Sequence, residues 1–206
     1  MLDNSELIAK FCPQTADGDT FIYTEMLDRS ARKGNNANRL VKTFYHRSEE
    51  EFREQWPTIK ALCDLAQVRA CTRLAPRSYR KVGAEFTRMV VDASLTDNFA
   101  GMKSLYNRAC GIVSPNEKLW LFDVDVINGD TLDYEVRLKS IDQRGAFINE
   151  PRFGTGNAWV HIATIPSKKG LHYITRPFDM REHQMPPDVS LHKDNPTNLY
   201  IPEGAA

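Results

Sequence analysis

Apolar and polar positions recur with two different periods along the 206-residue chain, and these periods predict a mixture of strands and helices. Short runs rich in aromatic and β-branched residues predict strands, whereas an apolar residue at every third or fourth position predicts an amphipathic helix. In the first half we expect a short helix opening at Asn4 or Ser5, strands at 21–27, 40–46 and 68–74, and helices at 49–67, 77–94 and 99–110.

Local signals support several of these elements. The basic, Gly- and Asn-rich stretch DRSARKGNNANR joins the first two strands, which is typical of a long β-hairpin with a positive tip. Ser48 followed by Glu51 forms a capping box, which predicts that a helix begins at 49. Pro57 within that helix predicts a kink or a restart.

The second half has a different pattern, in which strands dominate. LWLFDVDVI predicts a strong strand, and SLHKDNPTNLYIP predicts a final strand or hairpin. Between them we expect a helix at 131–143 and two strands, 158–166 and 170–178, joined by a basic turn. No repeat or long linker separates independent domains. The sequence therefore predicts one α+β domain over 1–206, with an N-terminal α/β unit (1–114) and a second unit containing a sheet (115–206).

Composition narrows the class of protein. A hydrophobic fraction of 41% and a charged fraction of 26% are those of a soluble globular protein. Lys+Arg and Asp+Glu number 27 each, which argues against a charge-driven DNA coat but leaves a local basic groove open. The 4 cysteines show no CxxC spacing, which argues against structural zinc and favours reduced thiols. With no signal peptide and no apolar run of ~18 residues, we expect a cytoplasmic protein without a membrane partner.

The first candidate for chemistry is the acid pair in LWLFDVDV. Asp123 and Asp125 lie two positions apart in the predicted strand and so project from the same face, with Phe122 and Val124 on the other. Two carboxylates on one face repel each other unless a cation neutralises them, and Mg²⁺ and Mn²⁺ favour carboxylate oxygens. The alternative is an ordinary strand whose polar face is solvated.

The second candidate is the turn SKKGLH. Ser167 offers a hydroxyl, Lys168 and Lys169 offer positive charge, and Gly170 permits a tight turn or a close backbone approach. His172 returns near the mouth of the same hairpin. Donors of these kinds converging on one place suit a phosphate, whereas the alternative is a solvated hairpin turn. An acid pair and a basic turn together supply both halves of a metal–triphosphate site.

LFDVDV followed by PSKKGLHYI resembles the first two motifs of the archaeo-eukaryotic primase superfamily, and the Ser…Gly-x-His hairpin also resembles that of the polymerase domains of bacterial end-joining ligases. The resemblance implies an N-terminal α/β unit packed on an RRM-like mixed sheet. It also implies a metal-dependent nucleotidyltransferase that binds a nucleoside triphosphate and starts or extends a strand on single-stranded or primed nucleic acid.

The resemblance assigns roles residue by residue. Asp123 and Asp125 would hold Mg²⁺ or Mn²⁺, and Ser167 and His172 would contact the phosphates. Beyond the resemblance, the charge of the turn leads us to expect that Lys169 also binds triphosphate, and that Arg176, which shares the face of His172 on the outgoing strand, assists.

The family also expects a third acid at the start of a later strand. Asp188 and Asp194 are both candidates, and we favour Asp188 as the third catalytic and metal-binding residue. If neither acid reaches the metal, the chain would be a catalytically silent module that binds nucleotide or nucleic acid. A metal-dependent nucleotide hydrolase is a further alternative.

Basic residues are numerous enough to form a nucleic-acid path, with a solvated, ion-paired face as the alternative. Strand alternation places Arg69, Cys71 and Arg73 on one face, which would line a template groove. The other members of this basic set are Arg29, Arg32, Lys33, Arg39, Arg77, Arg80 and Lys81. Because family primases rely on helicase or zinc modules not evident here, we also expect a helicase or another replication protein as partner, in a mobile-element or phage setting.

Overall fold

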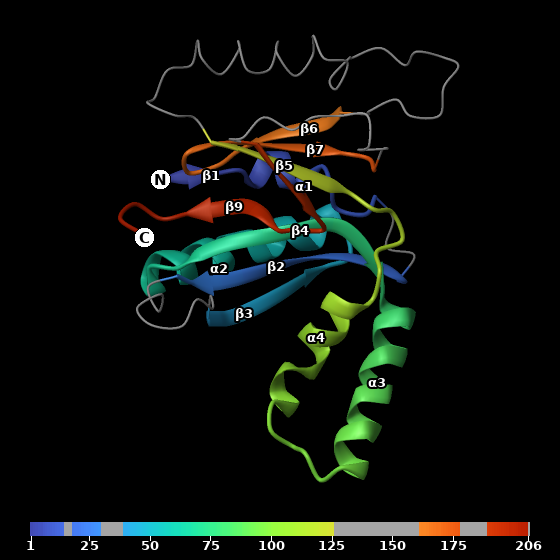
Figure 1. Cartoon of the computed structure of the whole chain (residues 1–206). Helices are drawn as coiled ribbons and strands as arrows, with labels where there is room; N and C mark the ends of the chain where they lie inside the picture. Colours follow the sequence, from blue (N-terminus) through green and yellow to red (C-terminus); the bar gives the residue numbers. More distant parts are fainter. Residues whose placement is uncertain (15–17, 30–38, 126–160, 178–188, 206) are drawn as a thin grey trace, which may run out of the picture.

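The computed structural model describes residues 1–14, 18–29, 39–125, 161–177 and 189–205. These residues form an α+β fold with two antiparallel sheets, as the sequence predicts (Figure 1). The tip of the first hairpin, the predicted helix at 131–143 and Asp188 lie outside the described residues.

Sheet A contains five strands in the order β1-β9-β4-β2-β3. Their bounds are Leu2–Asp3 (β1), Thr20–Asp28 (β2), Arg39–His46 (β3), Arg69–Ser78 (β4) and Thr197–Ile201 (β9). Apolar residues cover both faces of β2: Ile22 and Met26 belong to one core cluster, and Phe21 and Tyr23 to another. Sheet A is therefore a central layer with helices on both sides.

The helices on the two faces are α1 (Ser5–Ala9) and α2 (Glu49–Ala66) on one side, and α3 (Tyr79–Leu95) and α4 (Leu105–Ile112) on the other. A short 3₁₀ turn, η2 (Met102–Ser104), precedes α4, so the predicted helix at 99–110 is divided in two. Figure 1 shows α3 and α4 projecting together away from both sheets.

Side chains fix where two of these helices begin. Ser48 accepts a hydrogen bond from the Glu51 N–H at 3.2 Å, which confirms the predicted start of α2. Ser78 caps α3 in the same way, accepting from the Lys81 N–H at 3.1 Å. The helix does not restart at Pro57: α2 continues through this residue, and the apolar face of α2 packs into the core.

Sheet B contains four strands in the order β6-β7-β5-β8, all antiparallel. Their bounds are Trp120–Asp125 (β5), His161–Pro166 (β6), Gly170–Thr175 (β7) and Val189–Lys193 (β8). The two central strands are β5 and β7, which are the first and third strands of this sheet in chain order, and this arrangement agrees with a split β-α-β sheet. The crossover segments of such a unit would be 126–160 and 178–188, outside the described residues, so the RRM-like fold stays a prediction.

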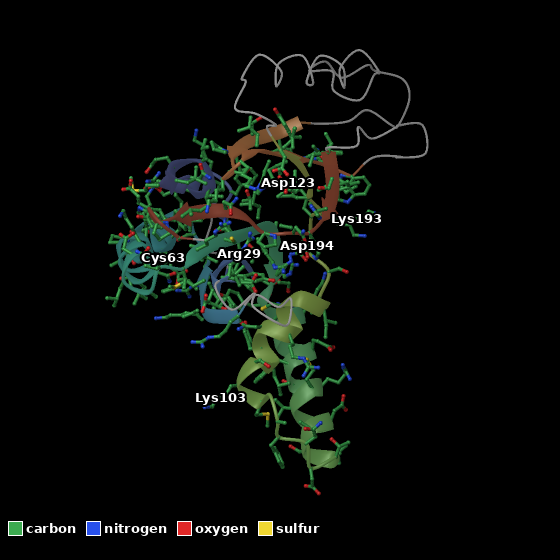
Figure 2. The ribbon with its side chains drawn as sticks, turned by 60° about the vertical axis from the view of Figure 1, so that its left-hand side comes forward. Arg29, Cys63, Lys103, Asp123, Lys193 and Asp194 are labelled. Atoms are coloured by element: carbon green, nitrogen blue, oxygen red, sulfur yellow. The ribbon has the colours of Figure 1, made fainter. Side chains whose placement is uncertain are left out.

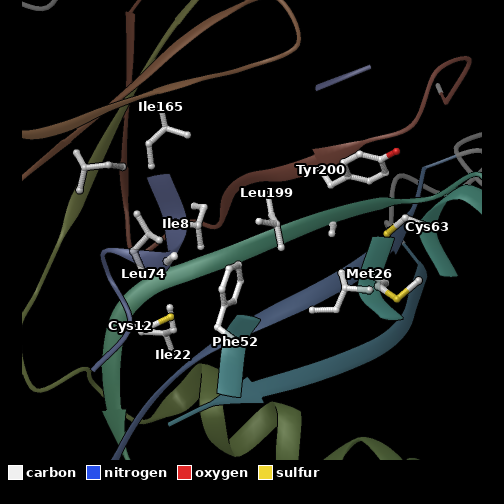
Figure 3. Packing of buried hydrophobic residues seen from close by; sticks show 14 of the residues in the cluster. Ile8, Cys12, Ile22, Met26, Phe52, Cys63, Leu74, Ile165, Leu199 and Tyr200 are labelled. Carbon is white, nitrogen blue, oxygen red and sulfur yellow. The ribbon is translucent and has the colours of Figure 1, made fainter. Parts of the chain in front are cut away.

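The end of the chain differs from the expected hairpin. β8 and β9 do not pair: β8 belongs to sheet B and β9 to sheet A, so the chain crosses between the sheets at 194–196. The division into 1–114 and 115–206 therefore misplaces β9, which lies in the sheet of the N-terminal half. One of the two core clusters joins the sheets, since Ile165 of sheet B packs in it with Ile8 and Leu199 (Figure 3), and Leu121 of sheet B belongs to the same cluster.

The crossing is fixed by a buried arginine. The Arg77 side chain is fully buried, donates to the carbonyl oxygens of Cys110 (2.7 Å) and Ala75 (2.8 Å), and forms an ion pair with Asp194. Asp194 also accepts from Arg73 through its carbonyl oxygen and has a left-handed backbone (φ 62°). Arg77 is therefore not part of a nucleic-acid path, contrary to the prediction, because it holds the strand crossing instead.

No helix in the described part of the chain combines the length and the apolar composition needed to cross a bilayer.

We expect Arg77→Met to lower the free energy of unfolding by about 3 kcal/mol, because it leaves the Asp194 carboxylate and the buried carbonyls without their donor. Urea unfolding followed by circular dichroism measures this loss. Arg108→Met, at an exposed position on α4, is the matched control and should change the free energy by less than about 0.5 kcal/mol. Equal effects of the two substitutions would contradict the anchoring role of Arg77.

Candidate functional site

A cleft of about 870 Å³ lies between the two sheets and brings together residues from distant parts of the sequence. From sheet B and its turn it is lined by the acids of β5, the residues that follow β6, and one histidine each from β7 and β8. From sheet A it is lined by charged residues of β2 and β4. Figure 2 labels Asp123 on the first wall and Arg29 on the second.

The acids of β5 both face this cleft. Asp123 lies opposite His172 on β7, and Asp125 lies opposite Gly170, so the acid pair sits directly beside the basic turn. Phe122 is buried on the other face of the strand, which fixes the register as the alternation predicts. The predicted sharing of one face by both carboxylates is thus confirmed.

The electrostatics of Asp123 are set mainly by its neighbour on β7. A hydrogen bond from His172 holds the pKa of the Asp123 carboxyl below its usual range, although partial burial opposes this shift. The positive field of His192 and Arg29 acts in the same direction. Asp123 is therefore ionised at neutral pH, as a cation ligand must be.

The turn after β6 is short and closely packed. Its two lysines lie between Ser167 and Gly170, the first residue of β7. The Ser167 N–H closes the turn by donating to the carbonyl oxygen of Gly170 at 2.9 Å. Lys168 donates to the Ala205 carbonyl oxygen at 2.9 Å, so its ammonium group is engaged at the end of the chain. Lys169 also lines the cleft, with Ser167. The structure thus brings Ser167, Lys169 and His172 together beside the acids.

Gly170 is required by a close backbone approach. A Cβ atom built at Gly170 would lie 1.9 Å from the carbonyl oxygen of Val124 on β5, far inside van der Waals contact. The two alternatives that the sequence left open, a tight turn or a close approach, are decided in favour of the second. The absence of a side chain lets the turn lie against the strand that carries the acids.

His172 is held at both ring nitrogens. Nδ1 lies 2.8 Å from the hydroxyl oxygen of Thr197 on β9, and Nε2 lies 3.4 Å from Oδ1 of Asp123. The side chains of His172 and Thr197 are both buried. Sequence analysis missed Thr197, because its contact depends on β9 crossing to the other sheet.

The third acid is not found among the described residues of this site. Asp194 is paired with Arg77 at the strand crossing, and Asp188 lies outside the described residues. Ser190 of β8 lies opposite Asp123 instead, and His192, which sequence analysis also missed, lies opposite Leu121 and lines the cleft. In the described part of the chain, no three His, Cys, Asp or Glu side chains are grouped closely enough to hold a metal ion.

Arg176 lies elsewhere. Its guanidinium forms an exposed ion pair with Glu117 at 3.1 Å, beyond the end of β7 that is remote from the turn. Four residues separate it from His172, about 13 Å along a strand. Arg176 is not part of the cleft lining, because alternation indicates the face of a strand but not the distance along it, and its help in phosphate binding stays a prediction.

The opposite wall of the cleft is basic. Arg69 and Arg73 of β4 line it, as the alternation predicts, and Arg29 joins them from the end of β2. Glu25 pairs with Arg73 at 3.3 Å. Arg80 and Lys81, at the start of α3, are not part of this lining, and the Lys81 ammonium group donates to the side-chain oxygen of Asn116. Arg32 and Lys33 lie outside the described residues.

The chain matches no protein-family model, no curated protein and no solved structure. Its function has to be inferred from the cleft itself.

We expect Gly170→Ala to lower the free energy of unfolding by about 1–3 kcal/mol, because the added methyl group must push the turn away from the Val124 carbonyl oxygen. Denaturant unfolding measures the loss. Gly83→Ala is the matched control: it lies within α3 with no atom within 4 Å of the new methyl group, so it should stabilise the protein by about 0.5–1 kcal/mol. A tolerated alanine at 170 would show that the close approach is not needed.

His172→Leu should raise the pKa of Asp123 in the metal-free protein, because the principal hydrogen bond to its carboxylate is lost while the burial remains. Since the folded-state pKa lies below the unfolded value, this bond stabilises the fold above about pH 4, and the contribution is lost as the pH falls through the folded-state pKa. Carboxyl ¹³C NMR titration measures the shift. Asp19, whose pKa is lowered by the Arg80 N–H and the Ser78 hydroxyl, should titrate unchanged.

Proposed function

We propose that this protein is a metal-dependent nucleotidyltransferase of the primase–polymerase type. The observation that carries the proposal is the pairing of β5 with β7, which sets Asp123 opposite His172 and Asp125 opposite Gly170 in one cleft. This arrangement supports the proposal because one metal-bound triphosphate would be able to contact both the acid pair and the basic turn.

In this proposal the acid wall holds the nucleotide. Asp123 and Asp125 would bind Mg²⁺ or Mn²⁺, and the metal would supply charge neutralisation for the phosphate oxygens. The Ser167 hydroxyl and the Lys169 ammonium group would donate to the phosphates, and His172 would add its Nε2–H at the base of the cleft. Gly170 would let these donors lie close to the acids.

The basic wall would hold the nucleic-acid strand. Arg29, Arg69 and Arg73 line the side of the cleft opposite the acid pair, and arginine is well suited to backbone phosphates. The separation of the charges supports this division of roles, because a strand and a triphosphate would otherwise compete for the same cations. The cleft volume of about 870 Å³ falls within the usual range for small-molecule sites.

A second candidate function is favoured by one observation. The residue of β8 that lies opposite Asp123 is Ser190, which is not an acid. If Asp188 does not complete the site, the protein would bind nucleotide or nucleic acid without catalysing transfer.

Primer extension and dinucleotide synthesis with Mn²⁺ or Mg²⁺ test the proposal. Asp123→Asn and Asp125→Asn should each lower incorporation by at least about 100-fold, because metal coordination contributes several kcal/mol to transition-state stabilisation. Asp97→Asn, at an exposed position with a left-handed backbone that asparagine tolerates, should retain activity.

Each result separates the two candidates. If the wild-type protein binds triphosphate but incorporates none with either metal, the nucleotidyltransferase proposal fails and the silent binding module is favoured. Undiminished incorporation by Asp123→Asn would also overturn the role given to this carboxylate.

A further inference from the structure

Thr197 contacts His172 from the other sheet. Its hydroxyl oxygen lies 2.8 Å from Nδ1 of the imidazole, and its side chain is fully buried. Thr197 opens β9, which pairs with β1 and β4 of sheet A, whereas His172 lies on β7 of sheet B. A residue of sheet A therefore positions the imidazole of a histidine that belongs to sheet B.

A second contact holds this arrangement in register. The buried Asn4 side chain donates from Nδ2 to the carbonyl oxygens of Asn198 (2.8 Å) and Pro166 (2.9 Å). Asn198 follows Thr197 on β9, and Pro166 precedes the basic turn on β6. Asn4 thereby links β9 to β6, the strand that leads into the basic turn, while Thr197 of β9 contacts His172 after that turn.

The chemistry of the two ring nitrogens gives this contact a consequence. A neutral imidazole has one N–H donor and one acceptor, so the partner of Nδ1 decides whether Nε2 carries the proton. If the Thr197 hydroxyl donates to Nδ1, Nε2–H is left as a donor toward Asp123, whose Oδ1 lies 3.4 Å away. An ionised carboxylate beside Nε2 favours the same tautomer, since it accepts hydrogen bonds and donates none.

We propose that Thr197 is a positioning residue that keeps the Nε2–H of His172 directed into the cleft. Thr197 holds the imidazole in one tautomer and one orientation, so that Nε2 donates to Asp123 in the empty site and to a phosphate oxygen when nucleotide is bound. The second part rests on the proposed function, in which His172 is a phosphate ligand. The first part is a property of the ligand-free protein.

Thr197→Val removes the hydroxyl and keeps the shape, and Thr197→Ser keeps the hydroxyl. Thr72→Val is the matched control, because Thr72 lies opposite Thr197 on β4, is equally buried, and bonds to Thr24 at 2.8 Å rather than to His172. Long-range ¹H–¹⁵N NMR of the His172 ring in the ligand-free protein reports the tautomer. Fluorescence titration with a labelled nucleoside triphosphate and Mn²⁺ reports binding.

We expect Nε2 of His172 to carry the proton in the wild type, in Thr197→Ser and in Thr72→Val, and the Nδ1–H form to become populated in Thr197→Val. The dissociation constant for triphosphate should rise about tenfold in Thr197→Val, because a hydrogen bond to a charged group is weakened, and return toward wild type in Thr197→Ser.

Unchanged ring signals in Thr197→Val would overturn the proposal, as would an equal change in Thr72→Val, since the effect would then belong to core packing. If the wild-type protein binds no triphosphate, the function proposed for the cleft fails, while the tautomer measurement still decides the role of Thr197.

Discussion

The crossing of the chain from β8 to β9 is the constraint on which the candidate site depends. It joins the two sheets covalently at 194–196, and the buried Arg77 holds it through Asp194 and two backbone carbonyls. Because β9 lies between β1 and β4, this connection ties sheet B to an interior strand of sheet A. Most residues of the two walls lie on paired strands, and the turn that carries Ser167 and Lys169 is held against β5, which favours the precision that a ligand site needs.

Much of the local structure could be predicted from the sequence, because it depends on neighbouring residues. The alternation in LWLFDVDV determines that Asp123 and Asp125 share a face, and Ser48 with Glu51 determines where α2 begins. The same alternation along β4 correctly placed Arg69 and Arg73 together. In each case the signal lies within a few residues of its effect.

The predictions that proved wrong depend on contacts between distant segments. Nothing near Arg77 in the sequence distinguishes it from Arg73, yet only the Arg77 side chain is fully buried, because Asp194 and the Cys110 carbonyl meet it from far along the chain. β8 and β9 are separated by a turn typical of a hairpin, but their partners lie in different sheets. Thr197 could not be found for the same reason, since its contact with His172 forms only when β9 of sheet A lies close to β7 of sheet B.

Some of the charged side chains in the described part of the cleft are paired with one another. Asp123 lies beside His172 on one wall, and on the other Arg73 is paired with Glu25 and bound to the Asp194 carbonyl oxygen. A triphosphate without a cation would draw the His172 donor away from Asp123 and leave that carboxylate without its hydrogen bond, which is costly in a partly buried site. In the proposed function, Asp123 would hold the metal that accompanies the triphosphate, and the His172 donor would bind a phosphate oxygen instead. The Nε2–H would then have an acceptor both with and without nucleotide, provided that the Thr197 hydroxyl still holds Nδ1.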